Sequence, residues 1–187
     1  MSPESVETAR TSGLTPLETR RALDALRGLR AMNHIEDSAT VHETATVWHY
    51  AVILQDVVLG ERVSIGSHCE VGRGCVIGNG TRIGSGTFLP PNTQVGQDVF
   101  IGPHVVMCDD KHPRIHAPGH PPYFAEPPVI QNHAVIGAGC VILPGVTIGT
   151  AARIGAGAVV TCDVPAFGHV RGEPARTKAL STAAGRW

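Results

Sequence analysis

Aliphatic residues recur at every sixth position through the middle of this 187-residue chain. The row runs from Val41 and Val47 to Met107 and resumes from Ile130 to Val160. A small or β-branched residue usually lies two positions before each member, and glycine follows many of them. This period matches neither the helical period of about 3.6 residues nor a simple alternating strand. It is typical of a parallel β-helix, in which each hexapeptide supplies a short strand and a corner.

The repeat also predicts the core. If three hexapeptides close one coil, residues eighteen apart stack in columns, such as Val41, Leu59, Ile77 and Val95. Each column buries apolar surface worth roughly 25 cal/mol per Å². Twelve units precede the interruption and six follow it, so we predict an all-β protein of about six coils. The β-helix is expected over 39–165, with 166–187 closing the last coil.

Residues 1–38 lack this period and are predicted to form a polar tail and a capping helix. Thr15 is a predicted N-cap, with Pro16 at the first helical position and Glu18 at the third. Leucines and alanines then form an apolar stripe to about residue 31, and the arginines fall mostly outside it. The helix is expected to cap the first coil or to dock on a neighbouring subunit. A second interpretation is that its arginines help to hold an anionic substrate.

Composition narrows the choice of partners. The net charge is -1 and no run of basic residues occurs, so nucleic acid polymers and membranes are not expected as partners. No apolar stretch is long enough for a signal peptide or a membrane span. Cys69, Cys75 and Cys140 occupy the small inward slot of the repeat, which suits a free thiol. A reduced, cytoplasmic protein is therefore predicted.

The repeat is interrupted between Met107 and Ile130, where 23 positions replace the expected six. Residues 108–128 are therefore predicted to leave the coil as one extruded loop that prolines stiffen. A loop of this length in a compact domain usually has a function. Polar residues concentrate in its first half, namely Asp109, Asp110, Lys111, His112, Arg114, His116 and His120.

The loop histidines allow three interpretations. His112, His116 and His120 have a metal-like spacing, but the prolines between them prevent the helix that would align them. No metal site is therefore predicted. The histidines could be incidental surface residues, or one of them could be a catalytic base, because imidazole accepts a proton near neutral pH.

Trp48, His49 and Tyr50 stand out in an early coil, because two aromatic residues interrupt a run of small ones. All three fall outside the inward slots and are expected on an outer face. Subunit packing and stacking on a nucleotide base or sugar are both compatible with that position. Trp48 and His49 are therefore candidate substrate-binding residues.

The C-terminal half carries a specific resemblance. Three segments closely resemble the acetyl-CoA-binding end of the hexapeptide-repeat acyltransferases, namely IGAGCVILPGVTIG, IGAGAVVTCDVP and GEPAR. The resemblance implies a left-handed β-helix, a homotrimer with active sites between subunits, and acetyl-CoA as the acyl donor. It implies cofactor contacts at Gly137, Ala138, Gly155, Ala156, Thr161 and Arg176.

Two groups within this family compete for the acceptor. Two segments resemble the nucleotide-sugar N-acetyltransferases, which acetylate an amino sugar on a UDP or dTDP carrier. These segments are ATVWHYAVI and VFIGPHVVMCDDKHPR. Those enzymes commonly have Asn where this chain has Asp109, followed by a Pro-Arg pair that Pro113 and Arg114 match. His112 before Pro113 instead matches the catalytic pair of the sugar and xenobiotic O-acetyltransferases. N-acetylation is thus the first implied activity, and O-acetylation of a sugar or small-molecule hydroxyl is the second.

The chemistry of acyl transfer suggests roles for the loop residues. His112 is predicted to take the proton of the nucleophile, a role that typically contributes about 10²- to 10⁴-fold to the rate. Asp109 would orient the imidazole or hold an acceptor ammonium group. Lys111 and Arg114 are candidates for contacts with a substrate phosphate, although ordinary solvated charges explain them equally well.

Two other classes of function are weaker. Carbonic-anhydrase-like metalloenzymes share this β-helix and a Trp-containing early coil. The repeats here offer His68, His104 and His133, without the spacing of that group. A non-catalytic scaffold is the remaining alternative.

Overall fold

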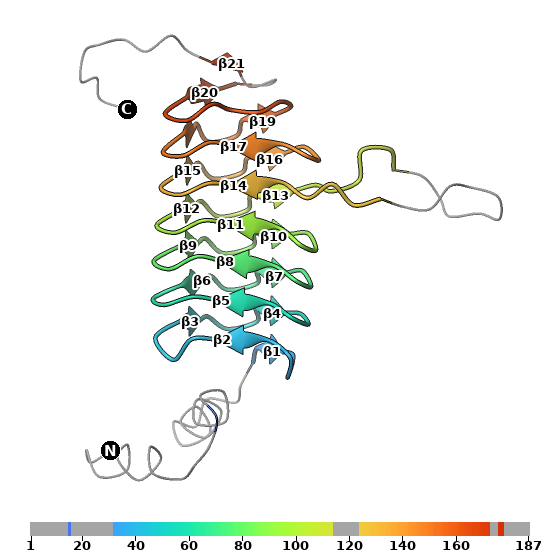
Figure 1. The fold of residues 1–187 in the computed structure, drawn as a ribbon, viewed down its shortest axis with the longest axis vertical. Coiled ribbons are helices and arrows are strands. Elements are labelled where there is room, and N and C mark those ends of the chain that lie inside the picture. The colour runs from blue at the N-terminus through green and yellow to red at the C-terminus, as the bar shows by residue number, and fades with distance from the viewer. Residues whose placement is uncertain (1–14, 16–31, 114–123, 173–175, 178–187) are drawn as a thin grey trace, which may run out of the picture.

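Each hexapeptide forms a two-residue strand and a corner, and three hexapeptides complete one turn of a parallel β-helix (Figure 1). The computed structural model that shows this describes Thr15 and residues 32–113, 124–172 and 176–177. The all-β architecture predicted from the repeat is confirmed over these residues. The predicted helix over 16–31 lies outside them.

Three sheets form the sides of the coil. Sheet A contains β1 (His34–Ile35), β4 (Val52–Ile53), β7 (Glu70–Val71), β10 (Phe88–Leu89), β13 (Val106–Met107), β16 (Val141–Ile142) and β19 (Val159–Val160). Sheet B contains β2 (Thr40–Val41), β5 (Val58–Leu59), β8 (Val76–Ile77), β11 (Gln94–Val95), β14 (Val129–Ile130) and β17 (Thr147–Ile148). Sheet C contains β3 (Thr46–Val47), β6 (Ser64–Ile65), β9 (Arg82–Ile83), β12 (Phe100–Ile101), β15 (Val135–Ile136), β18 (Arg153–Ile154), β20 (His169–Arg171) and β21 (Arg176–Thr177). We call the corners between successive sheets corner AB, corner BC and corner CA.

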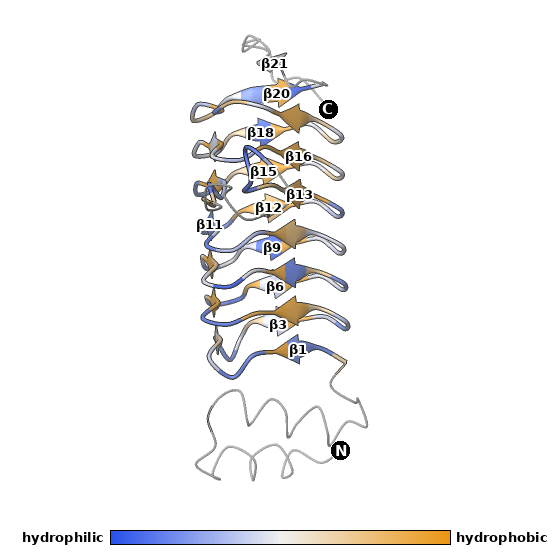
Figure 2. Cartoon of the chain, turned by 90° about the vertical axis from the view of Figure 1, so that its right-hand side faces the viewer, coloured by the Kyte–Doolittle hydropathy of each residue, from blue (hydrophilic) through white to orange (hydrophobic). Residues whose placement is uncertain are grey.

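The inward residues stack as the repeat predicts. In sheet B, Val41 pairs with Leu59, Leu59 with Ile77, and Ile77 with Val95. The second residue of nearly every strand is buried, while the first is exposed or half-buried, because successive side chains of a strand point to opposite faces. Apolar residues accordingly concentrate on the strands and hydrophilic ones at the corners (Figure 2).

The coil has about seven turns, so the prediction of about six is too low. An extra unit precedes the predicted repeat, because β1 pairs with β4 and places Ile35 beneath Ile53. Further units follow it, where Val164 bridges to Ile148 and β20 pairs with β18. The last strand, β21, turns back antiparallel to β20, which the repeat did not indicate.

Small polar groups inside the coil are all hydrogen-bonded. Thr81 Oγ1 donates to the Gly96 carbonyl at 2.7 Å, and Thr93 Oγ1 donates to the Pro90 carbonyl at 2.7 Å. Cys75 is free and buried, as its inward slot predicted, and burial raises the pKa of its thiol to about 11. The thiols at these slots therefore behave as small core groups.

One segment leaves this regular stack. The chain departs from sheet A after Met107 and returns to sheet B at Val129, so the loop emerges at corner AB (Figure 1). Strand pairing continues across the loop, because β14 pairs with β11 and β15 pairs with β12. The insertion therefore does not disturb the register of the turns on its two sides.

Candidate functional site

The upper turns of corner CA present a strip of backbone without large side chains. Ala138 and Ala156 are exposed and lie on successive turns, joined by a hydrogen bond from the Gly157 N–H to the Ala138 carbonyl (2.8 Å). Gly139 and Gly157 adopt φ of +67° and +70°. A Cβ at these two glycines would meet no atom of the described residues within 4 Å. The strip is therefore open to a ligand over two turns.

Gly137 and Gly155 have a packing role beneath this strip. A Cβ at Gly137 would clash with the backbone of Ala156 in the next turn. A Cβ at Gly155 would lie 3.1 Å from the Cβ of Arg171. These glycines allow the turns to approach closely, and Ala138 and Ala156 form the surface.

Arg176 and Thr161 are the other two residues predicted to bind the cofactor, and neither lies on the strip itself. Arg171 lies on the turn above Gly155, and the chain then reverses and pairs Arg176 with Arg171, so the Arg176 backbone lies one strand beyond that turn. Thr161 is exposed at corner AB and follows β19, whereas Ala156 precedes that strand. The backbone of Arg176 therefore lies beyond the C-terminal end of the strip, and Thr161 lies across sheet A from it.

The lower turns of the same corner carry bulky side chains. Trp48 and Tyr50 are about half exposed, at 53% and 50%, on an outer face as predicted. Trp48 Nε1 donates to Ser64 Oγ at 3.3 Å, and the Tyr50 ring stacks on His68 with centroids 5.0 Å apart. Four turns separate Tyr50 from Gly139 in this corner, which is roughly 19 Å. One chain therefore does not bring Trp48 and His49 next to the strip.

The two limbs of the loop are tied together at corner AB. The Glu126 N–H donates to the Asp109 carbonyl (2.8 Å), and the Gly145 N–H of the next turn donates to the Glu126 carbonyl (2.6 Å). Lys111 Nζ lies 3.5 Å from Glu126 Oε2. Glu126 thus joins the outgoing limb, the returning limb and the turn above.

Sequence analysis missed Glu126, because its place in the coil depends on where the loop ends. Its carbonyl occupies the position that Gln55 and Arg73 hold below, where each accepts the N–H of the corner residue one turn higher. Gly145 makes room for it, since a Cβ there would lie 3.0 Å from Glu126 Oε2. The only available signal was the acidic residue shortly before the repeat resumes.

His112 and Asp109 lie on the outgoing limb. Asp109 is half-buried, while His112 is exposed and its backbone N–H donates to Asp110 Oδ1 at 2.8 Å. This local turn directs the chain just before Pro113. Arg114, predicted to contact a phosphate, lies outside the described residues, as do His116 and His120.

The strip and the loop stand at the two edges of sheet A. Corner CA precedes each strand of this sheet and corner AB follows it, so a full side of the coil separates Ala138 from Glu126. The outward residues between them are apolar, with Val106 41% exposed and Val141 and Val159 half-buried. Within one chain the two halves of the predicted site do not meet.

The described residues also bear on metal binding and on membrane insertion. In that part of the chain, no group of three or more His, Cys, Asp or Glu side chains is arranged to hold a metal ion. No helix there has the length and apolar character needed to cross a membrane.

Known proteins share both sequence and fold with this chain. A candidate acetyltransferase of Schizosaccharomyces pombe is 43% identical over 83 residues, which cover 44% of this chain and 40% of that protein. A hexapeptide transferase family protein of Anaplasma phagocytophilum superposes with a TM-score of 0.61 at 22% identity, covering 80% of this chain and 83% of that one. A mutant GDP-perosamine N-acetyltransferase of Caulobacter crescentus, solved with CoA and GDP-perosamine, gives 0.55 at 21% identity, covering 96% and 76%.

The yeast relative is matched over less than half of its length, and the two solved structures share the fold. The family model described as bacterial transferase hexapeptide (six repeats) matches residues 38–73, 74–109 and 127–162. These ranges cover more than half of the chain and leave out most of the loop. The chain therefore belongs to the bacterial hexapeptide transferase family.

Proposed function

We propose that this protein is an acetyltransferase that uses acetyl-CoA to N-acetylate an amino sugar carried on UDP or dTDP. The observation that carries the proposal is the open strip at Ala138, Gly139, Ala156 and Gly157. A pantetheine arm is narrow and carries amide groups, so it requires a groove without side chains and with accessible backbone. Arg176, in β21 beyond the end of the strip, would contact a phosphate of CoA.

Relatives and structural neighbours support this choice of reaction. The S. pombe relative is named as a candidate acetyltransferase. The C. crescentus neighbour was solved with CoA and with a nucleotide-linked amino sugar. This combination of donor and acceptor fits a groove beside a polar loop, because both ligands carry phosphates and the acceptor carries an amine.

The proposed site forms between chains of a left-handed homotrimer. Because sheet A separates the strip from the loop within one chain, the loop of one subunit must approach the strip of its neighbour. At acetyl-CoA concentrations well below KM, a mixed trimer of loop-defective His112→Ala chains and strip-defective Gly139→His chains should therefore be more active than either parent trimer, because some of its sites combine an intact loop with an intact strip. No recovery on co-expression of these two variants would place the complete site within one chain.

The reaction itself requires a nucleophile, a base and a place for negative charge. The acceptor amine attacks the thioester carbonyl, a C–N bond forms, the C–S bond breaks, and CoA leaves as the thiol. Asp109 holds the acceptor as its ammonium ion, which releases one proton to solvent before attack. His112 then takes the second proton from the attacking amine and gives it to the sulfur of the leaving thiol. A backbone N–H at the glycine-rich corner stabilises the oxyanion. Lys111 Nζ lies 3.5 Å from Glu126 Oε2, so a substrate phosphate that binds Lys111 would compete with Glu126.

O-acetylation of a sugar or small-molecule hydroxyl is the second candidate. It is favoured by Asp109, which stands where the nucleotide-sugar enzymes commonly have Asn, and by the His112-Pro113 pair at the start of the loop. A hydroxyl is less nucleophilic than an amine at neutral pH, so this reaction would depend more strongly on His112.

A thiol-release assay with acetyl-CoA separates these candidates. The acceptor panel contains UDP- and dTDP-linked amino sugars, free sugars and simple amines. Turnover only with a nucleotide-linked amine is the expected result. Turnover with hydroxyl acceptors would favour the O-acetyltransferase, and no thiol release with any acceptor, together with no binding of CoA, would overturn the proposal.

A further inference from the structure

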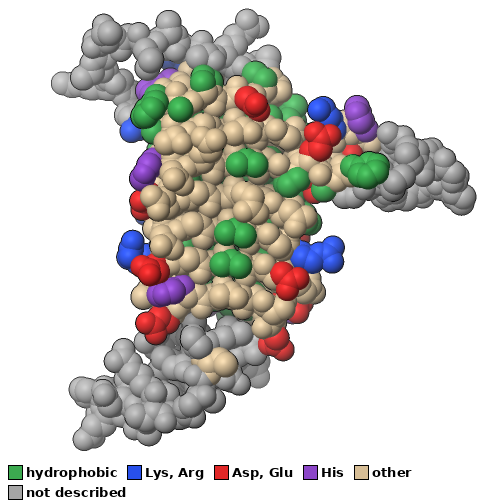
Figure 3. Space-filling model, in the orientation of Figure 1, with side chains coloured by type: hydrophobic (Ala, Val, Ile, Leu, Met, Phe, Trp, Pro, Cys, Tyr) green, Lys and Arg blue, Asp and Glu red, His purple; other side chains and the backbone are tan. Residues whose placement is uncertain are grey.

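Sheet B differs from the other two sheets in having no ionisable residue on its outer face within the described strands. Its outward residues are Thr40, Val58, Val76, Gln94, Val129 and Thr147. Sheet A carries His34 and Glu70, and sheet C carries Arg82, Arg153 and His169. Figure 3 views sheet B and shows charged side chains mainly along the edges of the face. A ligand on this face therefore meets uncharged groups.

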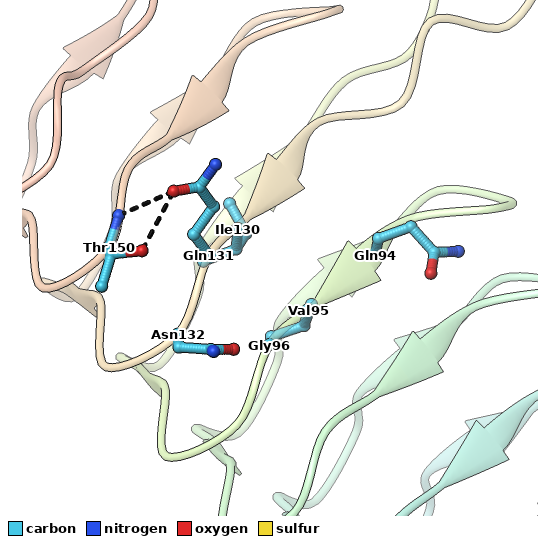
Figure 4. A pocket seen from close by; sticks show the side chains of 7 residues that line it. All are labelled: Gln94, Val95, Gly96, Ile130, Gln131, Asn132 and Thr150. Atoms are coloured by element: carbon cyan, nitrogen blue, oxygen red, sulfur yellow. Dashed lines mark hydrogen bonds between the residues drawn. The ribbon is translucent and has the colours of Figure 1, made fainter.

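A pocket of about 330 Å³ lies where sheet B runs into corner BC (Figure 4). It is formed by the ends of β11 and β14 and by Thr150 of the next turn, and none of its seven lining residues is ionisable. Its volume is at the lower end of the range for small-molecule sites, which suits a single ring.

The pocket exists because one residue breaks a row of glycines. Gly60, Gly78, Gly96 and Gly149 end the neighbouring strands of sheet B, and a Cβ at any of them would clash with the next turn. Gln131 takes this position after β14 and carries a long side chain that forms one wall. Opposite it, the Asn132 side chain lies over Gly96 and forms a further part of the lining.

Hydrogen bonds orient the wall of the pocket. The N–H and the hydroxyl of Thr150 both donate to Gln131 Oε1, at 3.0 and 3.1 Å. Because that oxygen is engaged, the amide NH₂ of Gln131 points away from Thr150 (Figure 4). Asn132 Oδ1 accepts the N–H of Gln97 at 3.0 Å, which leaves the Asn132 NH₂ as a second donor.

Gln94, on the other side of the pocket from Gln131 and Thr150, offers an acceptor (Figure 4). Gln94 Nε2 donates to the Asn92 carbonyl at 3.3 Å, so Gln94 Oε1 is available to a ligand. Around the pocket, the amides of Gln131 and Asn132 offer donors and the amide of Gln94 offers an acceptor, and sugar hydroxyls match such a set because they both donate and accept. We propose that this pocket binds a neutral sugar unit.

Such a unit could come from a separate glycan or from the sugar part of the acceptor. From Glu126 at the base of the loop, the chain passes through β14 and reaches Gln131 directly after that strand. An acceptor held beside the loop could therefore reach the pocket along the outer face of sheet B. The two sources share the same chemistry and are distinguished by the experiment.

The experiment is an NMR titration of the ¹⁵N-labelled full-length protein, observing the side-chain NH₂ signals of glutamine. Methyl α-D-glucopyranoside is the neutral probe, and UDP-glucose and UDP are compared with it. Saturable shifts of the Gln94 and Gln131 signals are expected with the methyl glucoside. If UDP-glucose moves the same signals and UDP does not, the unit belongs to the acceptor. If UDP-glucose leaves them unchanged, it belongs to a separate glycan.

Three variants make the titration decisive. Gln131→Gly restores the glycine of the row, and Gln94→Ala removes the acceptor, so each should weaken sugar binding about three- to tenfold. Gln55→Ala removes an exposed glutamine outside the pocket and should leave the affinity unchanged. Absence of saturable shifts, or equal affinity in all variants, overturns the proposal. Because no acetyl transfer is measured, that failure leaves the proposed reaction untouched.

Discussion

Corner CA has two different surfaces on one backbone. In the lower turns its left-handed position is filled by Tyr50, His68 and His104, with φ between +56° and +63°. In the upper turns the same position is filled by Gly139 and Gly157. The lower residues show that this corner tolerates a side chain.

This difference between the lower and upper turns indicates that Gly139 and Gly157 do more than relieve backbone strain. A left-handed residue other than glycine costs roughly 1 kcal/mol, which the coil accepts three times below. Gly86 is the contrasting case, because His104 lies over it and fills the space that a Cβ would need. At Gly139 and Gly157 that space is open, so the upper surface is suited to a ligand and the lower one to packing.

The prediction with the largest expected effect tests whether the lower and upper surfaces of corner CA share one continuous hydrophobic core. Ile83 is 1% exposed and stacks between Ile65 and Ile101. Ile83→Asp should unfold the protein, because an unpaired buried charge costs several kcal/mol. Arg82→Asp places the same carboxylate on the outer face and should change the free energy of unfolding by less than about 0.5 kcal/mol. Chemical denaturation measures both, and a folded Ile83→Asp protein would contradict the stacking.

The sequence predicted this core well because its period is unbroken there. It missed the first turn because Asn33 stands where the repeat usually has a small apolar residue. Asn33 Nδ2 donates to the Val47 carbonyl at 3.1 Å and its Oδ1 accepts the Ala51 N–H at 3.3 Å. A side chain thus supplies hydrogen bonds at the end of the coil, and the hydrophobic pattern does not report them.

The candidate site was only partly predictable for a related reason. Ala138 and Ala156 are eighteen residues apart, so their stacking follows from the period. The contact of Glu126 with Asp109 depends on the residue at which the loop rejoins corner AB, which no period determines. The pairing of β21 with β20 reverses the chain and has no counterpart in the repeat.

The second largest effect tests whether a loop group acts on a ligand at the upper surface. His112→Ala should lower kcat about 10²-fold or more, because the proton of the nucleophile loses its acceptor. The KM for acetyl-CoA and the thermal unfolding temperature should stay the same, since His112 is exposed on the loop. A variant that keeps nearly the full rate would move the base role to Asp109.

The third prediction concerns an exchange of residues between the lower and upper surfaces of corner CA. Gly139→His gives the upper corner the residue that the lower corner has at His104. We expect the KM for acetyl-CoA to rise about tenfold, equivalent to about 1.4 kcal/mol, because the imidazole would occupy the groove. His104→Gly is the reverse exchange and should leave that KM unchanged. Thermal shifts with added CoA provide a second readout, because a ligand that binds only the folded state stabilises it.

Equal acetyl-CoA affinities in these two variants would remove the distinction between the surfaces. The KM for the acceptor is the control for Gly139→His, because the strip is proposed to hold the donor alone. A rise in both KM values would indicate a distorted corner instead of a blocked groove.

The smallest effect concerns the base of the loop, where Lys111 and Glu126 join its two limbs. The Lys111–Glu126 pair is exposed, with 58% and 46% of the side chains accessible, so each single reversal should lower kcat/KM only about two- to fivefold. The double variant Lys111→Glu/Glu126→Lys restores the attraction with opposite polarity and should recover most of the activity. Recovery would assign Lys111 to positioning of the loop. If the double variant stays as slow as Lys111→Glu alone, Lys111 acts on a substrate phosphate, because a glutamate there would repel the phosphate whatever residue stands at 126.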